Sequence, residues 1–506
     1  MRRLVGIAGA LLTALLAGCT VGPDFVRPAA PEVTSYTPDK LPAQTAASKV
    51  AGGEAQHFVA GQDIPGQWWT LFHSQPLNAL IERALKANPS LQAAQAALRQ
   101  ARETAYATAG ALYPTAGGNL STTREKISGG EFGQPGKSPL FNLSTASVSI
   151  SYGLDIFGGA RRALEASRSQ AEFERFQLEA AYLTLTSNVV VAAVQEASLR
   201  SQIAATQDII KAESQELAVL QRQFTLGGSS KAAVLAQQAT LALERATLPP
   251  LQKQLAQQRN LLAVLAGRFP SQGSGERFEL ATMQLPRDLP LTLPSQLVEQ
   301  RPDVRAAEAQ LHQASAEIGV ATANMLPQFT LNAQFGSTAG DLSSLFTPGT
   351  AIWSIGGGIA QTLFDAGTLL HKKRAAEAAF DQSAAQYRGT VLTAFQNVAD
   401  ALRALQSDAD ALNAQVAAER SAGASLALTR QQFRLGAVSY VSLLTAEQVY
   451  QQAKVTLVLA QAARYADTAA LFQALGGGWW NRADAHSPED RGIDSFLPPP
   501  LAVDSH

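Results

Sequence analysis

The sequence predicts a membrane protein of mixed α and β class, in which each chain supplies four strands and two long helical hairpins. Two observations lead to this prediction. The chain repeats its own pattern once, and short stretches of alternating polarity lie between long tracts that contain no proline. A third observation, a single cysteine directly behind an apolar N-terminal run, indicates export and attachment to a membrane.

The N-terminal residues 1–18 have the order of an export signal. Arg2 and Arg3 precede an apolar run from Leu4 to Leu16, and the small residues Ala17 and Gly18 follow it. A charged region, a short apolar region and small residues at a cleavage site are the three parts of a signal peptide. The run is shorter than the roughly 18 or more apolar residues of a membrane-spanning helix. We therefore assign 1–18 to a signal peptide.

Cys19 is the only cysteine of the chain. The stretch Leu16-Ala17-Gly18-Cys19 resembles the bacterial lipobox, in which cleavage before the cysteine frees its sulfur and amine for acylation. From this resemblance we expect Cys19 to be the lipidation site. Two or more acyl chains would hold the protein to a membrane far more firmly than one. The residue after the cysteine influences sorting in such lipoproteins. Threonine at position 20, in place of an aspartate, is compatible with the outer membrane. The alternative is a small residue at an ordinary cleavage site.

The composition excludes several classes of protein. One cysteine cannot form an intrachain disulfide, and 6 scattered histidines do not make an ordinary Cys/His zinc cluster. The 40 basic and 41 acidic residues leave no basic footprint for nucleic acid. No His, Ser or carboxylate cluster has a recurrent catalytic spacing, and 3 methionines do not form a soft-ligand relay for Cu(I). We expect no enzyme activity, no cofactor and no metal site.

An internal duplication relates the two halves of the chain. The stretch "NPSLQAAQAALRQARETAYATAGALYPTAGGNLS" from Asn88 lines up with "RPDVRAAEAQLHQASAEIGVATANMLPQFTLNAQ" from Arg301. Further on, "RQFTLGGSSKAAVL" matches "QQFRLGAVSYVSLL", and "LLAVLAG" matches "ALFQALG". Three matched blocks in one order indicate two similar halves of about 210 residues with the same order of elements.

The proline-free windows predict the long helices. No proline occurs between Pro139 and Pro249 or between Pro348 and Pro488, and proline costs about 3 kcal/mol inside a helix. The second window carries an apolar heptad from Phe380 to Val416, and the first carries Ile203, Ile210, Leu217 and Phe224 at intervals of seven. A helix from 160 to 224 would be about 100 Å long. Each long helix ends at a glycine turn, and a second helix then returns toward Gly267 or Gly476.

The strands are predicted between the helices. Val148, Ile150, Tyr152, Leu154 and Ile156 alternate with Ser149, Ser151, Gly153 and Asp155, so one face is apolar and the other polar. The stretch "PQFTLNAQFGS" repeats this pattern, and weaker versions begin at Ile352 and Thr115. Such alternation fits an edge strand of a soluble sheet as well as a transmembrane barrel.

The number of strands predicts an oligomer. Four strands per chain cannot close a barrel, because the smallest transmembrane barrels have eight, and unpaired strand edges in lipid cost several kcal/mol per group. Three chains that pool their strands would give twelve. The segments 129–139 and 340–348, which are rich in turn-forming residues, would join the strands at the outer surface.

Seven stretches of the sequence carry a resemblance to a known family. They are "GCTVGPDFVRP", "WWTLFHSQPLNALIERALKANPSLQAA", "ATLPPLQKQLAQQRNLLAVLAG", "LPSQLVEQRPDVRAAEAQL", "IGVATANMLPQFTL", "LFDAG" and "ALGGGWW", and they span most of 19–480. The chain resembles the TolC-like outer-membrane factors of tripartite efflux systems, and most of all their NodT-type lipoprotein branch. Gln300, where the family commonly has arginine, and the tail after Trp480 depart from the family pattern.

The resemblance implies a trimer. Its twelve-stranded transmembrane β-barrel, with four strands per chain, would lie in the bacterial outer membrane and be continued by an α-helical barrel across the periplasm. The repeat and the resemblance divide the chain into a signal peptide (1–18), a lipidated N-terminal segment with an equatorial portion (19–87), a first repeat (88–270), an equatorial linker (271–300), a second repeat (301–480) and a disordered tail (481–506).

The resemblance also implies a function and partners. Channels of this family are passive exit ducts for drugs or other small molecules, which an inner-membrane pump delivers through a periplasmic adaptor protein. The helix-turn-helix tips of the channel meet the adaptor. In this chain the tips are Leu226, Gly227 and Gly228 in the first hairpin and Leu435, Gly436 and Ala437 in the second.

Beyond Val416 the heptad becomes polar, and this change suggests a gate. Glu419 and Arg430 occupy the seam before the second tip, and ion pairs can exchange partners at smaller cost than a dry core can be opened. We hypothesise that these two residues help to close the periplasmic end; the alternative is that they are solvated residues. For the whole chain the alternative function is a structural coiled-coil lipoprotein tether, for which the four strands would have no purpose.

Overall fold

A computed structural model describes residues 20–128, 136 and 138–483. The signal peptide, Cys19 and most of the predicted tail lie outside this part of the chain. The described residues form two compact units, each of which takes residues from both repeats. Unit 1 contains 20–28, Leu98–Glu174 and Ala307–Tyr387, and unit 2 contains Ala29–Ala97, Arg175–Ala306 and 388–483.

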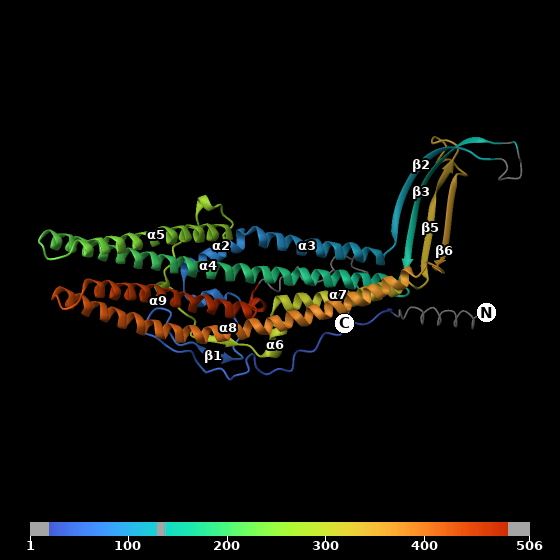
Figure 1. The fold of residues 1–506 in the computed structure, drawn as a ribbon. Coiled ribbons are helices and arrows are strands. Elements are labelled where there is room, and N and C mark those ends of the chain that lie inside the picture. Colours follow the sequence, from blue (N-terminus) through green and yellow to red (C-terminus); the bar gives the residue numbers. More distant parts are fainter. Residues whose placement is uncertain (1–19, 129–135, 137, 484–506) are drawn as a thin grey trace. The chain divides into compact units, whose positions relative to one another are not determined.

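Unit 1 contains a four-stranded antiparallel sheet (Figure 1), which confirms the four predicted strands. Its strands are β2 (Thr115–Lys126), β3 (Leu140–Leu154), β5 (Gln328–Ala339) and β6 (Ala351–Ala360), in the order β2-β3-β5-β6. Strands β2 and β6 each pair on one side only within the described chain. The sheet therefore has two unpaired edges.

The two faces of this sheet differ in polarity, as the alternation predicts. Directly opposite residues share a face, and Val148 lies opposite Phe335, which lies opposite Trp353. On the other face Ser149 lies opposite Gln334, which lies opposite Ser354. The apolar side chains are solvent-exposed in the single chain, at 67% for Phe335 and 74% for Trp353. A single chain thus leaves an apolar sheet face uncovered.

Two aspartates start the helices that follow the strand pairs. The Asp155 carboxylate accepts hydrogen bonds from the backbone N–H of Ala160 (2.8 Å) and Arg161 (3.0 Å). Asp365, at the corresponding place in the second repeat, accepts from the backbone N–H of Gly367 (2.9 Å) and Leu369 (2.8 Å). These bonds satisfy N–H groups that a helix leaves unpaired in its first turn.

The helices that follow are α4 (Gly159–Thr225) and α8 (Thr368–Arg434), each 67 residues long. At 1.5 Å per residue each is about 100 Å long, as predicted. Each turns back into a return helix, α5 (Lys231–Leu265) after α4 and α9 (Tyr440–Ala474) after α8. The helices α3 (Pro89–Ala109) and α7 (Pro302–Ala323) precede the strand pairs. Among the described residues no helix combines the length and apolar character needed to cross a membrane.

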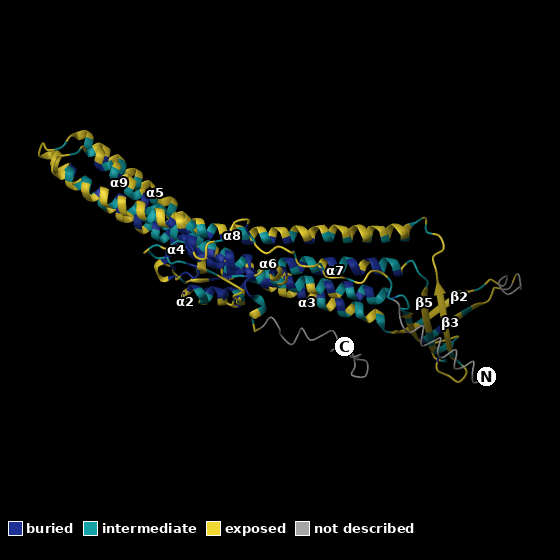
Figure 2. Cartoon of the chain, turned by 90° about the horizontal axis from the view of Figure 1, so that it is seen from below, coloured by how far each residue is buried: buried dark blue, intermediate teal, exposed yellow. Residues whose placement is uncertain are grey.

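Unit 2 contains a buried aromatic cluster. Trp68 stacks on Phe472 at 5.3 Å between ring centroids, and both side chains are fully buried. Unit 2 also contains the short elements β1 (His57–Ala60), which pairs in parallel with β4 (Asp288–Leu291), η1 (Trp68–Phe72), α2 (Gln75–Ala87), η4 (Pro270–Gln272), η5 (Leu280–Thr282), α6 (Pro294–Gln300) and η6 (Trp479–Asn481). Figure 2 shows burial concentrated near α2 and α6 and decreasing toward the hairpin turns.

Two details of the helices differ from the sequence analysis. Helix α5 returns toward Gly267 as predicted, but it continues through Pro249 and Pro250, which lie outside the proline-free windows. The two prolines remove the N–H groups that would bond to the carbonyls of residues 245 and 246, and this stretch is exposed, so water can replace the bonds. In α4 the predicted heptad is only half-buried, and Phe224 at its end is exposed. The buried stripe instead contains Thr206, Ile209, Glu213 and Leu220.

Candidate functional site

The segment after Cys19 is bound to the helices of unit 1. The Val21 N–H donates to the Phe157 carbonyl (3.0 Å), and the Arg162 Nε donates to the Val21 carbonyl (3.2 Å). Gly22 has φ +96°, and a Cβ there would collide with the backbone of Gly319 in α7. The chain therefore passes very close to α7 directly after the predicted lipidation site.

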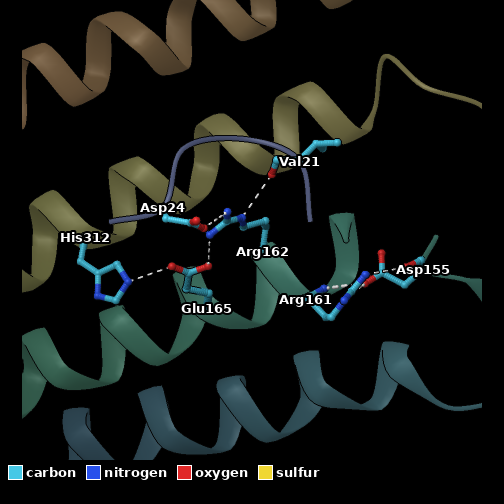
Figure 3. A network of polar contacts seen from close by, with 7 residues as sticks. All are labelled: Val21, Asp24, Asp155, Arg161, Arg162, Glu165 and His312. Carbon is cyan, nitrogen blue, oxygen red and sulfur yellow. Dashed lines mark hydrogen bonds and ion pairs between the residues drawn. The ribbon is translucent and has the colours of Figure 1, made fainter. Parts of the chain in front are cut away.

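Arg162 in α4 is the centre of a polar network that holds this segment (Figure 3). Its guanidinium donates to Asp24 (2.7 Å) and to Glu165 (2.8 Å). Glu165 also contacts the His312 Nε2 (2.9 Å), and the His312 ring stacks on Phe25 at 4.3 Å between centroids. A buried arginine with three acceptors thus joins the N-terminal segment to α4 and α7.

The two predicted hairpin tips have the same backbone geometry. In the first, the Gly228 N–H donates to the Gln223 carbonyl (2.8 Å) and the Gly227 N–H to the Phe224 carbonyl (3.0 Å). In the second, Ala437 donates to Gln432 (2.9 Å) and Gly436 to Phe433 (3.0 Å). This pair of bonds is the Schellman motif, which requires a left-handed residue after the helix. Gly227 (φ +77°) and Gly436 (φ +72°) supply that conformation.

A serine begins each return helix in the same way. The Ser230 Oγ accepts from the Ala233 N–H (3.1 Å), and the Ser439 Oγ accepts from the Ser442 N–H (3.2 Å). Both turns lie at the same end of unit 2 (Figure 1). Each presents one leucine to solvent, with Leu226 80% and Leu435 77% exposed. The six predicted tip residues thus form two matched turns with an apolar side chain at each apex.

The structure does not bring the two predicted gate residues together. Glu419 and Arg430 are eleven positions apart on α8, about 16 Å at 1.5 Å per residue. Arg430 instead donates to the Glu447 carboxylate of α9 at 3.0 Å, within its own hairpin. Glu419 is half-buried. Arg430 is thus part of a seam whose other members the sequence analysis did not identify.

The residues that the sequence analysis did not identify are buried polar groups between the two hairpins. Glu213 of α4 is 2% exposed and Glu447 of α9 is 3% exposed. The Gln451 side chain of α9 donates to Glu213 (2.6 Å), and the Tyr440 hydroxyl donates to Gln237 of α5. A sequence signal was available, because Glu213 stands three residues after Ile210 and four before Leu217, where an apolar stripe would continue.

Comparisons with known proteins agree with the family resemblance found in the sequence, and they cover most of the chain. The family model described as outer membrane efflux protein matches residues 80–268 and 293–477. The cation efflux system protein CusC of Escherichia coli O6:H1 is 30% identical over 470 residues, which are 92% of this chain and 96% of CusC. The probable outer membrane lipoprotein SilC of Salmonella typhimurium is 29% identical over 469 residues, 92% of this chain and 97% of SilC.

A solved structure supports the fold. The outer-membrane channel OprN matches with a TM-score of 0.80 at 27% identity, over 91% of this chain and 100% of the OprN chain. The two stretches matched by the family model follow the two repeats found in the sequence. The chain therefore belongs to the outer membrane efflux protein family, and it is an outer-membrane channel of an efflux system rather than an enzyme.

Proposed function

We propose that three copies of this chain form the passive exit duct of a tripartite efflux system. The observation that carries this proposal is the four-stranded sheet of unit 1, which has two unpaired edges and an exposed apolar face. The apolar face is stable against lipid, but the two edges are not, because unpaired backbone groups in lipid cost several kcal/mol each. Pairing β6 of one chain with β2 of the next removes every edge, and three chains give a closed barrel of twelve strands.

The two faces of the sheet define the inside and the outside of this barrel. The row Val148, Phe335 and Trp353 faces lipid, and the row Ser149, Gln334 and Ser354 faces the lumen. In this row small hydroxyl and amide groups line the lumen without fixed charge. A duct of this kind lets solutes of different chemistry pass, so the pump and the adaptor that deliver the cargo select it.

The hairpin tips are the proposed contact with a periplasmic adaptor protein, through which an inner-membrane pump delivers its cargo. Two matched turns with exposed leucines support this role, because an exposed apolar side chain at an apex gains free energy when a partner covers it. Glycine at each turn also allows a partner backbone to approach closely. Leu226, Gly227, Gly228, Leu435, Gly436 and Ala437 are the residues that we assign to this contact.

Lipidation of Cys19 is the second proposed attachment to the outer membrane. The network around Arg162 supports it, because it holds the chain from Val21 onward against α4 and α7 of unit 1, the unit that contains the sheet. The chain that follows the acylated residue is therefore held at a fixed place on unit 1 from Val21 onward.

Conductance in planar lipid bilayers tests the duct. The purified, acylated protein should insert and give discrete conductance steps of equal size, because each trimer contributes one lumen of fixed width. A closed end could block the current, so the measurement is repeated after the periplasmic tips have been removed by limited proteolysis. If membranes that contain this protein still show no conductance, the proposed duct function is wrong and the tether function applies.

A further inference from the structure

The two hairpins of unit 2 meet in a buried polar seam. Glu213 of α4 accepts from the Gln451 side chain of α9, and its backbone carbonyl accepts from Gln237 of α5 at 3.2 Å. Gln237 is fully buried and in turn accepts from the Tyr440 hydroxyl of α9. Glu213 therefore belongs to a chain of contacts that crosses from the first hairpin to the second.

Two carboxylate oxygens of this seam have no hydrogen-bond donor among the described residues. They are the Oε2 atoms of Glu213 and Glu447, and both are buried. Both side chains line one cavity of about 180 Å³ between α4, α8 and α9. A buried ionised oxygen without a donor costs free energy, because it has lost its water and gained no replacement.

The charges around Glu213 do not compensate it. Arg430 is bound to Glu447, and Lys454 of α9 is bound to Asp208 of α4 at 3.4 Å. The ionisable groups that face or surround Glu213 are Asp208 and Glu216 on α4, Glu244 on α5, Arg430 on α8, and Tyr440, Glu447, Tyr450 and Lys454 on α9. Both cations of this set are already bound to another carboxylate, so among the described residues neither is left to pair with Glu213.

We propose that Glu213 is a proton-dependent fastener between the two hairpins, which holds α4 against α9 when its carboxyl is protonated and releases them when it ionises. Protonation on Oε2 breaks no existing bond, because the Gln451 amide donates to Oε1. It also removes the repulsion between Glu213 and its acidic neighbours on α5 and α9. Only one part of this inference depends on the proposed function: if the chain forms a duct, separating the hairpins would widen the end of the duct at the hairpin tips.

The direction of the pH dependence follows from the burial. Burial raises the pKa of Glu213 to about 7; the Gln451 hydrogen bond opposes this shift, and Glu244 and Glu447 add to it. An unperturbed glutamate has a pKa of about 4.3. The stabilisation of the seam is therefore complete below about pH 4.3 and is lost as the pH rises through about 7. Alkaline conditions loosen the hairpins and acidic conditions fasten them.

Hydrogen exchange of the full, acylated protein tests this proposal. Amide protection in 208–216 and 443–454, corrected for intrinsic exchange, should fall by about tenfold between pH 6 and pH 8.5 in the wild type, the change that one pKa unit represents. Glu213→Gln, which keeps the Gln451 acceptor and has no charge, should show acid-like protection at both values. Asp410→Asn removes an exposed charge of α8 that lies outside this cavity and should keep the wild-type fall.

Either of two results overturns the proposal: a Glu213→Gln protein that retains the wild-type fall, or a wild type whose protection does not change. Infrared difference spectra of wild type against Glu213→Gln give a second readout. They should contain a protonated carboxyl band at pH 6 that is absent at pH 8.5, and its absence at pH 6 would also overturn the proposal. Because neither readout needs ion conduction, a failed duct and a failed fastener are distinguished.

Discussion

Asn88 and Arg301, which begin the two sequence repeats, each hold the end of a return helix. The Asn88 amide donates to the Leu265 carbonyl at the end of α5 (3.0 Å), and the Arg301 guanidinium donates to the Ala474 carbonyl at the end of α9 (2.9 Å). Two different side chains thus perform one task at equivalent positions. The duplication is visible in the structure as a repeated clamp as well as a repeated order of elements.

Replacing Arg301 by lysine should weaken the second clamp. The guanidinium also donates two bonds to Asp303 (2.9 and 2.7 Å), and a single ammonium cannot hold all three acceptors. We expect Arg301→Lys to lower the free energy of unfolding by about 1.5–3 kcal/mol, measured by denaturant titration of the helical circular dichroism. Arg277→Lys, at an exposed position, is the matched control. Equal stabilities of the two variants would show that the clamp contributes nothing.

A bulky side chain should affect ion flow on one face of β3 and not on the other. Ser149 lies on the polar face and Val148, its neighbour, on the apolar face. We predict that Ser149→Phe lowers the single-channel conductance, because the ring narrows the lumen, whereas Val148→Phe leaves it close to the wild-type value. Planar-bilayer recordings of both variants check this. The reverse order would mean that the apolar face lines the lumen.

The strands and their faces could be predicted from the sequence because a period of two residues determines the face directly. The repeat supplied the second pair of strands. The seam of α4 could not be predicted in the same way. The sequence favoured Ile203 and Ile210, whereas Thr206 and Glu213 are buried, because contacts with α5 and α9 decide which face of a half-polar helix is covered.

The proposed adaptor contact requires the apical leucines. Changing Leu226 and Leu435 together to glutamate should abolish capture of the adaptor by the channel, because two charges would be buried in place of two apolar side chains. Both positions are exposed in the chain, so the folded channel should keep its conductance. The exposed pair Arg222→Glu and Arg434→Glu, one turn or less from the same tips, is the control. Undiminished capture by the leucine variant would place the contact elsewhere.

The gate hypothesis gives a separate prediction for Arg430. Arg430→Ala leaves the buried Glu447 without its cation, and loss of one partner costs about 3–5 kcal/mol in a fully buried pair. Because the Arg430 side chain is 36% exposed, we expect the free energy of unfolding to fall by less than this. We also expect a higher closed-state conductance in planar bilayers. Glu419→Ala should raise it as well if both residues close the end, whereas Arg420→Ala, an exposed neighbour, should not. Unchanged closed-state conductance would remove Arg430 from the gate.

The mass of the protein extracted from outer membranes in mild detergent tests the central claim most directly. Native mass spectrometry of the wild type, labelled metabolically with palmitate, should give three times the mass of one acylated chain. Cys19→Ser should lose the label. A labelled monomer would contradict the pooled barrel, because four strands with two open edges would then be the complete sheet.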